Sequence, residues 1–143
     1  MKRLFALALF VACLGLPVPV LAQPSLGAAF LADETATIEL NDFAFAPRDL
    51  ALKVGRRHRL ILKNKGQVMH YFGSSDFFKA VEIVGFISGG VARPFTGQTH
   101  IPVNPGDSKE VIVKPKEPGQ FTFTCFVPTH VYNGMTGTIT VNP

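Results

Sequence analysis

The fold is decided by residues 121–141, FTFTCFVPTHVYNGMTGTITV, in which two strand-like stretches flank one loop. In the first stretch Phe123 and Cys125 alternate with threonines. In the second stretch Met135, Ile139 and Val141 share one parity, and the threonines at 136, 138 and 140 have the other. This period of two is typical of a β-strand with one buried face, so the apolar members face the core. We therefore expect Cys125 to end one strand and Met135 to begin its neighbour, with both sulfur side chains pointing inward at one end of the fold.

Short strands of this kind recur along the chain, separated by turns rich in Gly, Pro, Asn and Asp. Only residues 76–84 fit a helical turn, because Asp76 could cap it and the apolar residues that follow share one face. Residues 85–99 are rich in glycine and give no assignment. The expected strands are 35–40, 50–54, 58–64, 68–73, 108–113, 121–125 and 136–141. Short strands with almost no helix predict an all-β fold, an antiparallel β-sandwich.

The first residues are typical of a targeting segment rather than of a folded domain. Lys2 and Arg3 precede an apolar run at 4–16, and small residues follow at positions that a signal peptidase recognises. We expect residues 1–22 to be a signal peptide cleaved before Gln23, which would place the mature protein in the periplasm. The apolar run is too short for a confident membrane span, and no later stretch reaches about 18 apolar residues. Stable membrane insertion is therefore not expected.

The rest of the chain is predicted to consist of a flexible lead-in at 23–34 and one domain at 35–143. A lipid anchor on Cys13 is an alternative, because the residues before it loosely resemble a lipobox. Phe10 fits that motif poorly and the apolar stretch continues past Cys13, so the cleaved signal peptide is favoured. After cleavage only Cys125 remains, which excludes an intramolecular disulfide. A lone thiol in an oxidising compartment is either buried and inert or bound to another group.

Charge gives no support for a nucleic-acid partner. The formal net charge of the chain is +4, and it falls when Lys2 and Arg3 leave with the signal peptide. A basic cluster remains at residues 56–65. We interpret it as a solvated strand face; a docking patch for an acidic partner is the alternative.

The loop after Cys125 brings a thiolate, an imidazole and a thioether close together in the sequence, because His130 and Met135 follow it. Soft sulfur ligands favour Cu(I) and imidazole serves either oxidation state, so the set suits one copper ion that cycles between Cu(I) and Cu(II). With only 4 His and 3 Met in 143 residues, this spacing would seldom arise by chance. A His₂Cys site with a weak axial methionine needs a second imidazole, and His70, far away in the sequence, is the candidate.

These residues carry a resemblance to the cupredoxins, the family of small blue copper proteins. The spacing Cys-x₄-His-x₄-Met is similar to a rusticyanin-like copper loop, and residues 43–55, FAFAPRDLALKVG, resemble the opening of many small bacterial cupredoxins. The resemblance covers about residues 35–143 and implies a Greek-key β-sandwich of about seven or eight strands, with one short helical turn and a long loop. The copper ligands that it implies are His70, Cys125, His130 and Met135. Two features depart from it: Thr129 stands where many relatives have Gly, and residues 77–99 are longer and more apolar.

Other polar residues receive lesser roles. We interpret His58 as a surface residue and retain His100 as an alternative metal contact. Met69 has the opposite strand parity to His70 and should point away from the site. The amide of Asn64 is expected to tie the loop that carries His70 to the copper loop, since hydrogen bonds to the surroundings commonly orient metal ligands.

The expected function is one-electron transfer, because four protein ligands leave no open position for a substrate. The expected partners are redox proteins, such as a cytochrome or an oxidase, that dock near His130 on a monomer of this chain. A copper buffer, carrier or copper-resistance protein with the same site is the alternative. An enzyme is not expected: a multicopper oxidase needs histidines beside the cysteine, where Thr124 and Phe126 stand, and a binuclear copper centre needs two cysteines.

Overall fold

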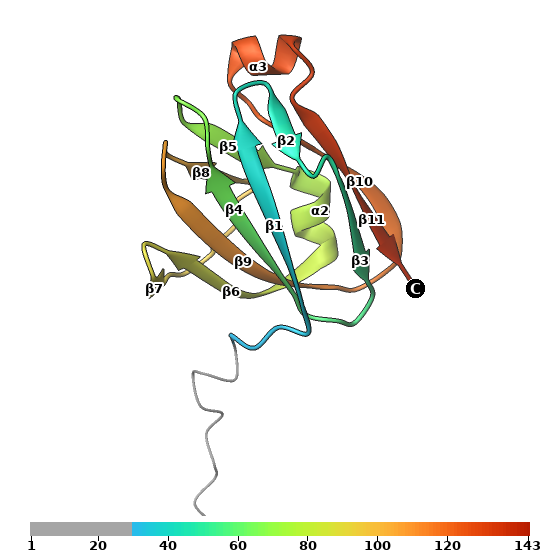
Figure 1. Cartoon of the computed structure of the whole chain (residues 1–143). Coiled ribbons are helices and arrows are strands. Elements are labelled where there is room, and N and C mark those ends of the chain that lie inside the picture. The colour runs from blue at the N-terminus through green and yellow to red at the C-terminus, as the bar shows by residue number, and fades with distance from the viewer. Residues whose placement is uncertain (1–29) are drawn as a thin grey trace, which may run out of the picture.

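Two β-sheets form a sandwich in the computed structural model, which describes residues 30–143 (Figure 1). The sheets have six strands in the order β2-β1-β4-β9-β6-β7 and five strands in the order β3-β11-β10-β5-β8. The first sheet contains β1 (Glu34–Asn41), β2 (Ala44–Ala46), β4 (His58–Asn64), β6 (Val81–Ser88), β7 (Val91–Ala92) and β9 (Ser108–Pro115). The second contains β3 (Asp49–Lys53), β5 (His70–Gly73), β8 (His100–Val103), β10 (Gly119–Thr124) and β11 (Thr136–Asn142). The predicted all-β sandwich is confirmed.

The strand pairing is mixed rather than purely antiparallel. β1 runs parallel to β4, and β3 runs parallel to β11, while the other pairs are antiparallel. Parallel neighbours need a crossover instead of a tight turn, and β2 and β3 supply it between β1 and β4. The expectation of a wholly antiparallel sandwich was wrong on this point.

The core between the sheets consists of the apolar residues that alternate in the sequence. Phe123 and Ile139 are fully buried, and Leu60 is buried on the opposite sheet. The ring of Phe123 lies 4.8 Å, between centroids, from the rings of both Phe45 and Phe72. Full burial of such a side chain stabilises the fold by about 1.5–3 kcal/mol. The three rings come from β2, β5 and β10, and their contacts hold these strands together in the core.

Helix α2 (Ser75–Ala80) is shorter than predicted, because the chain continues as strand β6 from Val81. Val81 and Ile83 pair with β9, and β-branched side chains favour a strand over a helix at these positions. The predicted extension of the helix to residue 84 is therefore wrong. The stretch 85–99, which the sequence left unassigned, continues β6 to Ser88 and then forms the short strand β7.

Short elements account for the remaining differences. Residues 30–143 contain eleven strands instead of about seven or eight. Strands β2 and β7 have only three and two residues, β8 lies in a stretch without a prediction, and β6 begins where the helical turn was expected to continue. A second helix, α3 (Pro128–Tyr132), occupies the loop between β10 and β11. No helix in this part of the chain is long and apolar enough to cross a membrane. The predicted signal peptide at 1–22, Cys13 and most of the lead-in at 23–34 lie outside the described residues.

Three connections meet at one end of the sandwich. Figure 1 shows α3 beside the turn between β1 and β2. The loop from β4 to β5 reaches the same turn, since the backbone N–H of Gln67 donates to the carboxylate of Asp42. The backbone N–H of Lys65 in that loop also donates to the carbonyl of Leu40 at 2.9 Å. Segments that are far apart in the sequence thus form a single site.

Candidate metal centre

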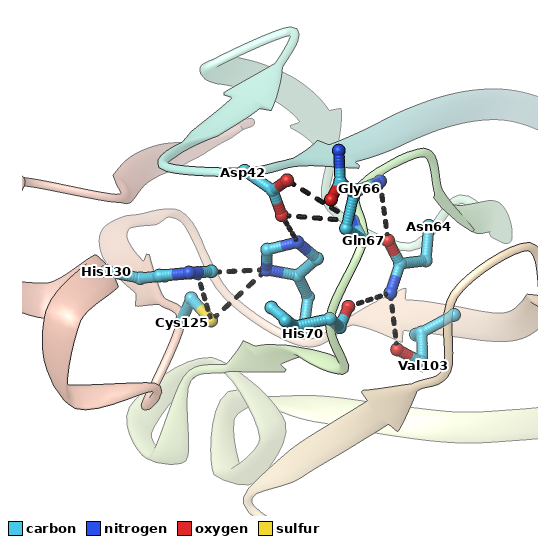
Figure 2. A network of polar contacts seen from close by, with 9 residues as sticks. Asp42, Asn64, Gly66, Gln67, His70, Val103, Cys125 and His130 are labelled. Carbon is cyan, nitrogen blue, oxygen red and sulfur yellow. Dashed lines mark hydrogen bonds and ion pairs between the residues drawn. The ribbon is translucent and has the colours of Figure 1, made fainter.

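Three of the predicted ligands converge in the interior at this end of the sandwich (Figure 2). His70 begins β5, Cys125 follows β10, and His130 lies in α3. The Sγ atom of Cys125 lies 3.7 Å from Nδ1 of His70 and 3.8 Å from Nδ1 of His130. The two Nδ1 atoms are 3.2 Å apart. All three residues are buried, and His130 has the largest exposure at 4%.

The loop that carries Cys125 and His130 is closed by its own backbone. Pro128 begins α3, where the missing N–H of proline costs no helical hydrogen bond. Gly134 follows the helix with a φ of 74°, a left-handed conformation that glycine adopts without strain. The N–H of Met135 then donates to the carbonyl of His130 at 2.9 Å, and the N–H of Cys125 donates to the carbonyl of Met135 at 3.1 Å. These bonds fix the two ligand-bearing ends of the loop relative to each other.

Met135 is 1% exposed and belongs to the same hydrophobic core as Cys125. Its inward direction agrees with the predicted parity, since Ile139 and Val141 on β11 are buried while the intervening threonines are partly exposed. The structure thus places the thioether on the core side of the strand that follows the copper loop. The assignment of Met135 as the axial ligand stays a prediction, as do the other three ligand assignments.

The lowered pKa of His70 favours metal binding, because it keeps the imidazole neutral. Burial has the largest effect on the pKa of His70 and lowers it from the ordinary value of 6.5. The hydrogen bond to Asp42 acts in the opposite direction, and the charge of a protonated His130 lowers the pKa further. Neutral imidazole is the form that binds a metal. Two imidazole nitrogens and a thiol that face one another in a closed, buried space fit a cation, and this donor set with a thioether nearby suits copper.

Asp42, which sequence analysis did not single out, contacts the outer side of His70. Its Oδ1 lies 3.1 Å from Nε2 of His70, the ring nitrogen opposite the one that faces Cys125 (Figure 2). Both carboxylate oxygens accept from the N–H of Gln67 at 3.2 Å. Gly66 permits this approach, because a Cβ there would run into both the carboxylate and the imidazole. No local pattern could have revealed Asp42, since it lies 28 positions from His70 and meets it only through the turn between β1 and β2.

Asn64 is buried, but its amide has different partners from the one predicted. Its Nδ2 donates to the carbonyls of Val68 and Val103, both at 2.8 Å, and its Oδ1 accepts from the N–H of Gly66 at 2.8 Å (Figure 2). The predicted link to the copper loop was wrong. Asn64 instead ties the loop that carries His70 to β8, because the ends of β4 and β8 approach each other there.

The remaining candidates lie apart from the cluster. His58 is 2% exposed and accepts a hydrogen bond from the N–H of Lys53 at 3.0 Å, so its assignment to the surface was wrong. His100 is partly buried, its ring lies 5.5 Å from that of Tyr71, and it does not belong to the ligand cluster found in residues 30–143. Met69 is 39% exposed, as its parity predicted.

A two-sheet sandwich with a buried cysteine and two histidines at one end is the arrangement of a cupredoxin. The chain belongs to the cupredoxin-like domain family, which matches residues 6–141. The copper-resistant cuproprotein CopI of Pseudomonas aeruginosa is 25% identical to it over 178 aligned positions, with 99% of this chain and 98% of that protein covered.

Solved structures show the same fold. Auracyanin B aligns with a TM-score of 0.54 at 23% identity, covering 79% of this chain and 91% of its own. Auracyanin from Roseiflexus castenholzii aligns with a TM-score of 0.56 at 19% identity, covering 78% of this chain and 99% of its own. At these identities the similarity concerns the fold alone.

Proposed function

We propose that the protein is an exported type 1 copper protein that carries single electrons between redox partners. The observation that supports this is the buried cluster in which Cys125 Sγ and the Nδ1 atoms of His70 and His130 lie 3.2–3.8 Å apart. A bound copper ion would supply the one-electron chemistry by alternating between Cu(I) and Cu(II). The chain holds the three donor atoms, and we propose the thioether of Met135 as the fourth, in a site that excludes water.

The burial of the donor set argues against catalysis. Catalytic metal sites keep an open position for water or substrate, whereas structural and electron-transfer sites are closed. The cysteine and both histidines are at most 4% exposed, so a substrate in solution would meet almost none of their surface. We therefore propose that the protein has no enzymatic activity of its own.

Exposed apolar side chains surround His130 and suit brief contacts with protein partners. The ring of Phe43 lies 4.8 Å from that of His130, between centroids, and Phe43 is 48% exposed. On α3, Val131 and Tyr132 are 45% and 90% exposed. Weak redox complexes use small interfaces of this kind. We propose that a cytochrome or an oxidase docks here on a monomer, with Phe43 in the short path between His130 and the partner.

A second candidate is copper handling in the periplasm, as a buffer, a carrier or a copper-resistance protein. The observation that favours it is the similarity to CopI, whose name describes copper resistance and which aligns over nearly the whole of both chains. This function would use the same donor set. The periplasmic location itself is proposed from the signal-peptide pattern at 1–22 and the single cysteine beyond it.

The test of the proposed site is the visible spectrum of the purified protein after addition of Cu(II). We expect an intense thiolate-to-copper charge-transfer band that Cys125→Ala abolishes. His100→Ala is the matched control and should leave the band unchanged, because His100 lies outside the cluster. A colourless protein, or a colour that survives Cys125→Ala, contradicts the proposal.

Further measurements separate the two candidate functions. An electron carrier should show fast electron self-exchange and rapid reduction by a cytochrome. A copper carrier should instead release Cu(I) readily to a metal-free acceptor protein, and its deletion should make cells sensitive to copper without slowing respiration.

A further inference from the structure

The turn between β1 and β2 touches both imidazoles of the candidate metal centre. It contains only Asp42 and Phe43, because Asn41 and Ala44 already pair with each other. Asp42 Oδ1 lies 3.1 Å from Nε2 of His70, and the ring of Phe43 packs on His130. The contact of Asp42 with His70 also joins the two sheets, since the turn belongs to the six-stranded sheet and β5 to the five-stranded sheet.

From this arrangement we infer that Asp42 is a positioning residue for the metal centre: its carboxylate fixes the orientation and tautomer of His70 and favours the more highly charged state of the bound ion. The inference rests on the proposed copper site. It adds a residue that acts through His70 and does not itself touch the metal.

The hydrogen bond sets which ring nitrogen carries the proton. An ionised carboxylate can only accept, so Nε2 of His70 must be the donor. Nδ1 is then unprotonated, and it is the nitrogen that lies 3.7 Å from Cys125 Sγ and 3.2 Å from Nδ1 of His130. A carboxylate on the outer nitrogen also makes an imidazole a stronger donor to a metal. The extra negative charge stabilises Cu(II) more than Cu(I), because the attraction grows with the charge of the ion.

The carboxylate is held in place by three neighbours with different roles. The N–H of Gln67 donates to both of its oxygens. Gly66 leaves the space in which Asp42 and His70 meet. Phe43 has a φ of 70°, a left-handed conformation that is strained for a bulky residue and that hairpin turns usually assign to glycine or asparagine. A strained, fixed turn beside a buried cluster is the arrangement expected of a functional contact.

The experiment compares three variants of Asp42 by their Cu(II) and Cu(I) affinities and by their reduction potential. Asp42→Asn keeps the shape and an acceptor oxygen but removes the charge; Asp42→Ala removes both; Asp42→Glu keeps the charge. Asp76→Asn is the control, because it removes the same charge from an exposed carboxylate whose ion pair is with Lys79 on α2. Thermal unfolding of each metal-free variant reports its effect on the fold.

We expect Asp42→Asn to weaken Cu(II) binding by about 10- to 100-fold, which is typical when a hydrogen-bond partner of a metal ligand is lost. Cu(I) binding should fall about tenfold less, so the potential rises by about 59 mV, the value of a tenfold ratio for one electron. Asp42→Ala should weaken Cu(II) binding at least as much as Asp42→Asn. Asp42→Glu, which keeps the charge, should have an affinity and a potential between those of Asp42→Asn and the wild type. Asp76→Asn should match the wild type.

The inference is overturned if Asp42→Asn has the same copper affinities and the same reduction potential as the wild type, whether or not its stability falls. Asp42 would then have only the role of holding Gln67. If that variant does not fold, nitrogen NMR of the metal-free wild type decides the point. A proton on Nε2 of His70 supports the inference, and a proton on Nδ1 refutes it. A wild-type protein without a copper–thiolate band contradicts the proposed function, whereas a coloured wild type with an indifferent Asp42 contradicts this inference alone.

Discussion

Replacing Asn64 with alanine should destabilise the metal-free protein and loosen the loop that carries His70. Asn64 ends β4, is 2% exposed and makes three hydrogen bonds of 2.8 Å, to the carbonyls of Val68 and Val103 and from the N–H of Gly66. The bond to Val103 crosses from the six-stranded to the five-stranded sheet. Alanine removes all three bonds in a closed part of the structure, and of the three backbone groups the N–H of Gly66 keeps a second acceptor, the carbonyl of Leu40 at 3.2 Å.

The magnitude follows from these contacts. A hydrogen bond contributes about 1 kcal/mol net, so three bonds amount to about 3 kcal/mol of the free energy of unfolding. For a domain of this size each kcal/mol shifts the melting temperature by about 4 °C, which predicts a decrease of roughly 12 °C. Because His70 begins β5 just beyond this loop, affinity for copper should fall as well.

Chemical denaturation of the metal-free protein measures the change, with Asn104→Ala as the matched control. The side chain of Asn104 is exposed and, among residues 30–143, bonds only to the carboxylate of Asp107, so its loss should cost no more than about 0.5 kcal/mol. If Asn64→Ala is as stable as Asn104→Ala, the three bonds do not hold the loop and the reasoning is refuted.

Three further changes have defined outcomes. Met135→Leu should keep the charge-transfer colour and raise the reduction potential, because the variant loses the weak axial sulfur that helps to stabilise Cu(II). Loss of all copper binding would contradict an axial role. Gly137→Ala should cost about 1–3 kcal/mol in denaturant unfolding, because the new Cβ would run into the ring of Phe123. Asp33 has a pKa lowered from 3.8, chiefly by the N–H of Arg57, so its contribution to stability is present above pH 3.8 and lost as the pH falls through the lower folded-state value. Asp33→Asn should therefore flatten this part of the acid unfolding profile, and an unchanged profile would exclude the contribution.

The parts of the site that sequence could predict are those that depend on local periodicity. The directions of Cys125 and Met135 follow from strand parity, and both residues are buried as expected. The place of His70 needed the additional requirement for a second imidazole and the family resemblance. Asp42 could not be predicted, because its contact with His70 depends on how two distant loops pack.

The errors in the fold have a similar cause. An apolar face at helical spacing suggested a helix to residue 84, but pairing with β9 decides the structure from Val81 onward. His58 follows two arginines and so resembled a surface residue, yet its ring lies against the backbone of Lys53 in the space between strands. Such outcomes depend on tertiary neighbours that a single sequence does not specify.

Helix α3 and the turn between β1 and β2 cover the candidate metal centre, and this cover has a kinetic consequence. A metal ion can enter or leave only when one of these covers opens, since His70 and Cys125 are fully buried and His130 is nearly so. Uptake should therefore reach a limiting rate that no longer increases with copper concentration, set by the frequency of local opening. The same barrier would keep a loaded protein from exchanging with dilute chelators. With this cover in place, electron transfer would need no opening, whereas delivery of a metal would need a partner that first displaces the cover.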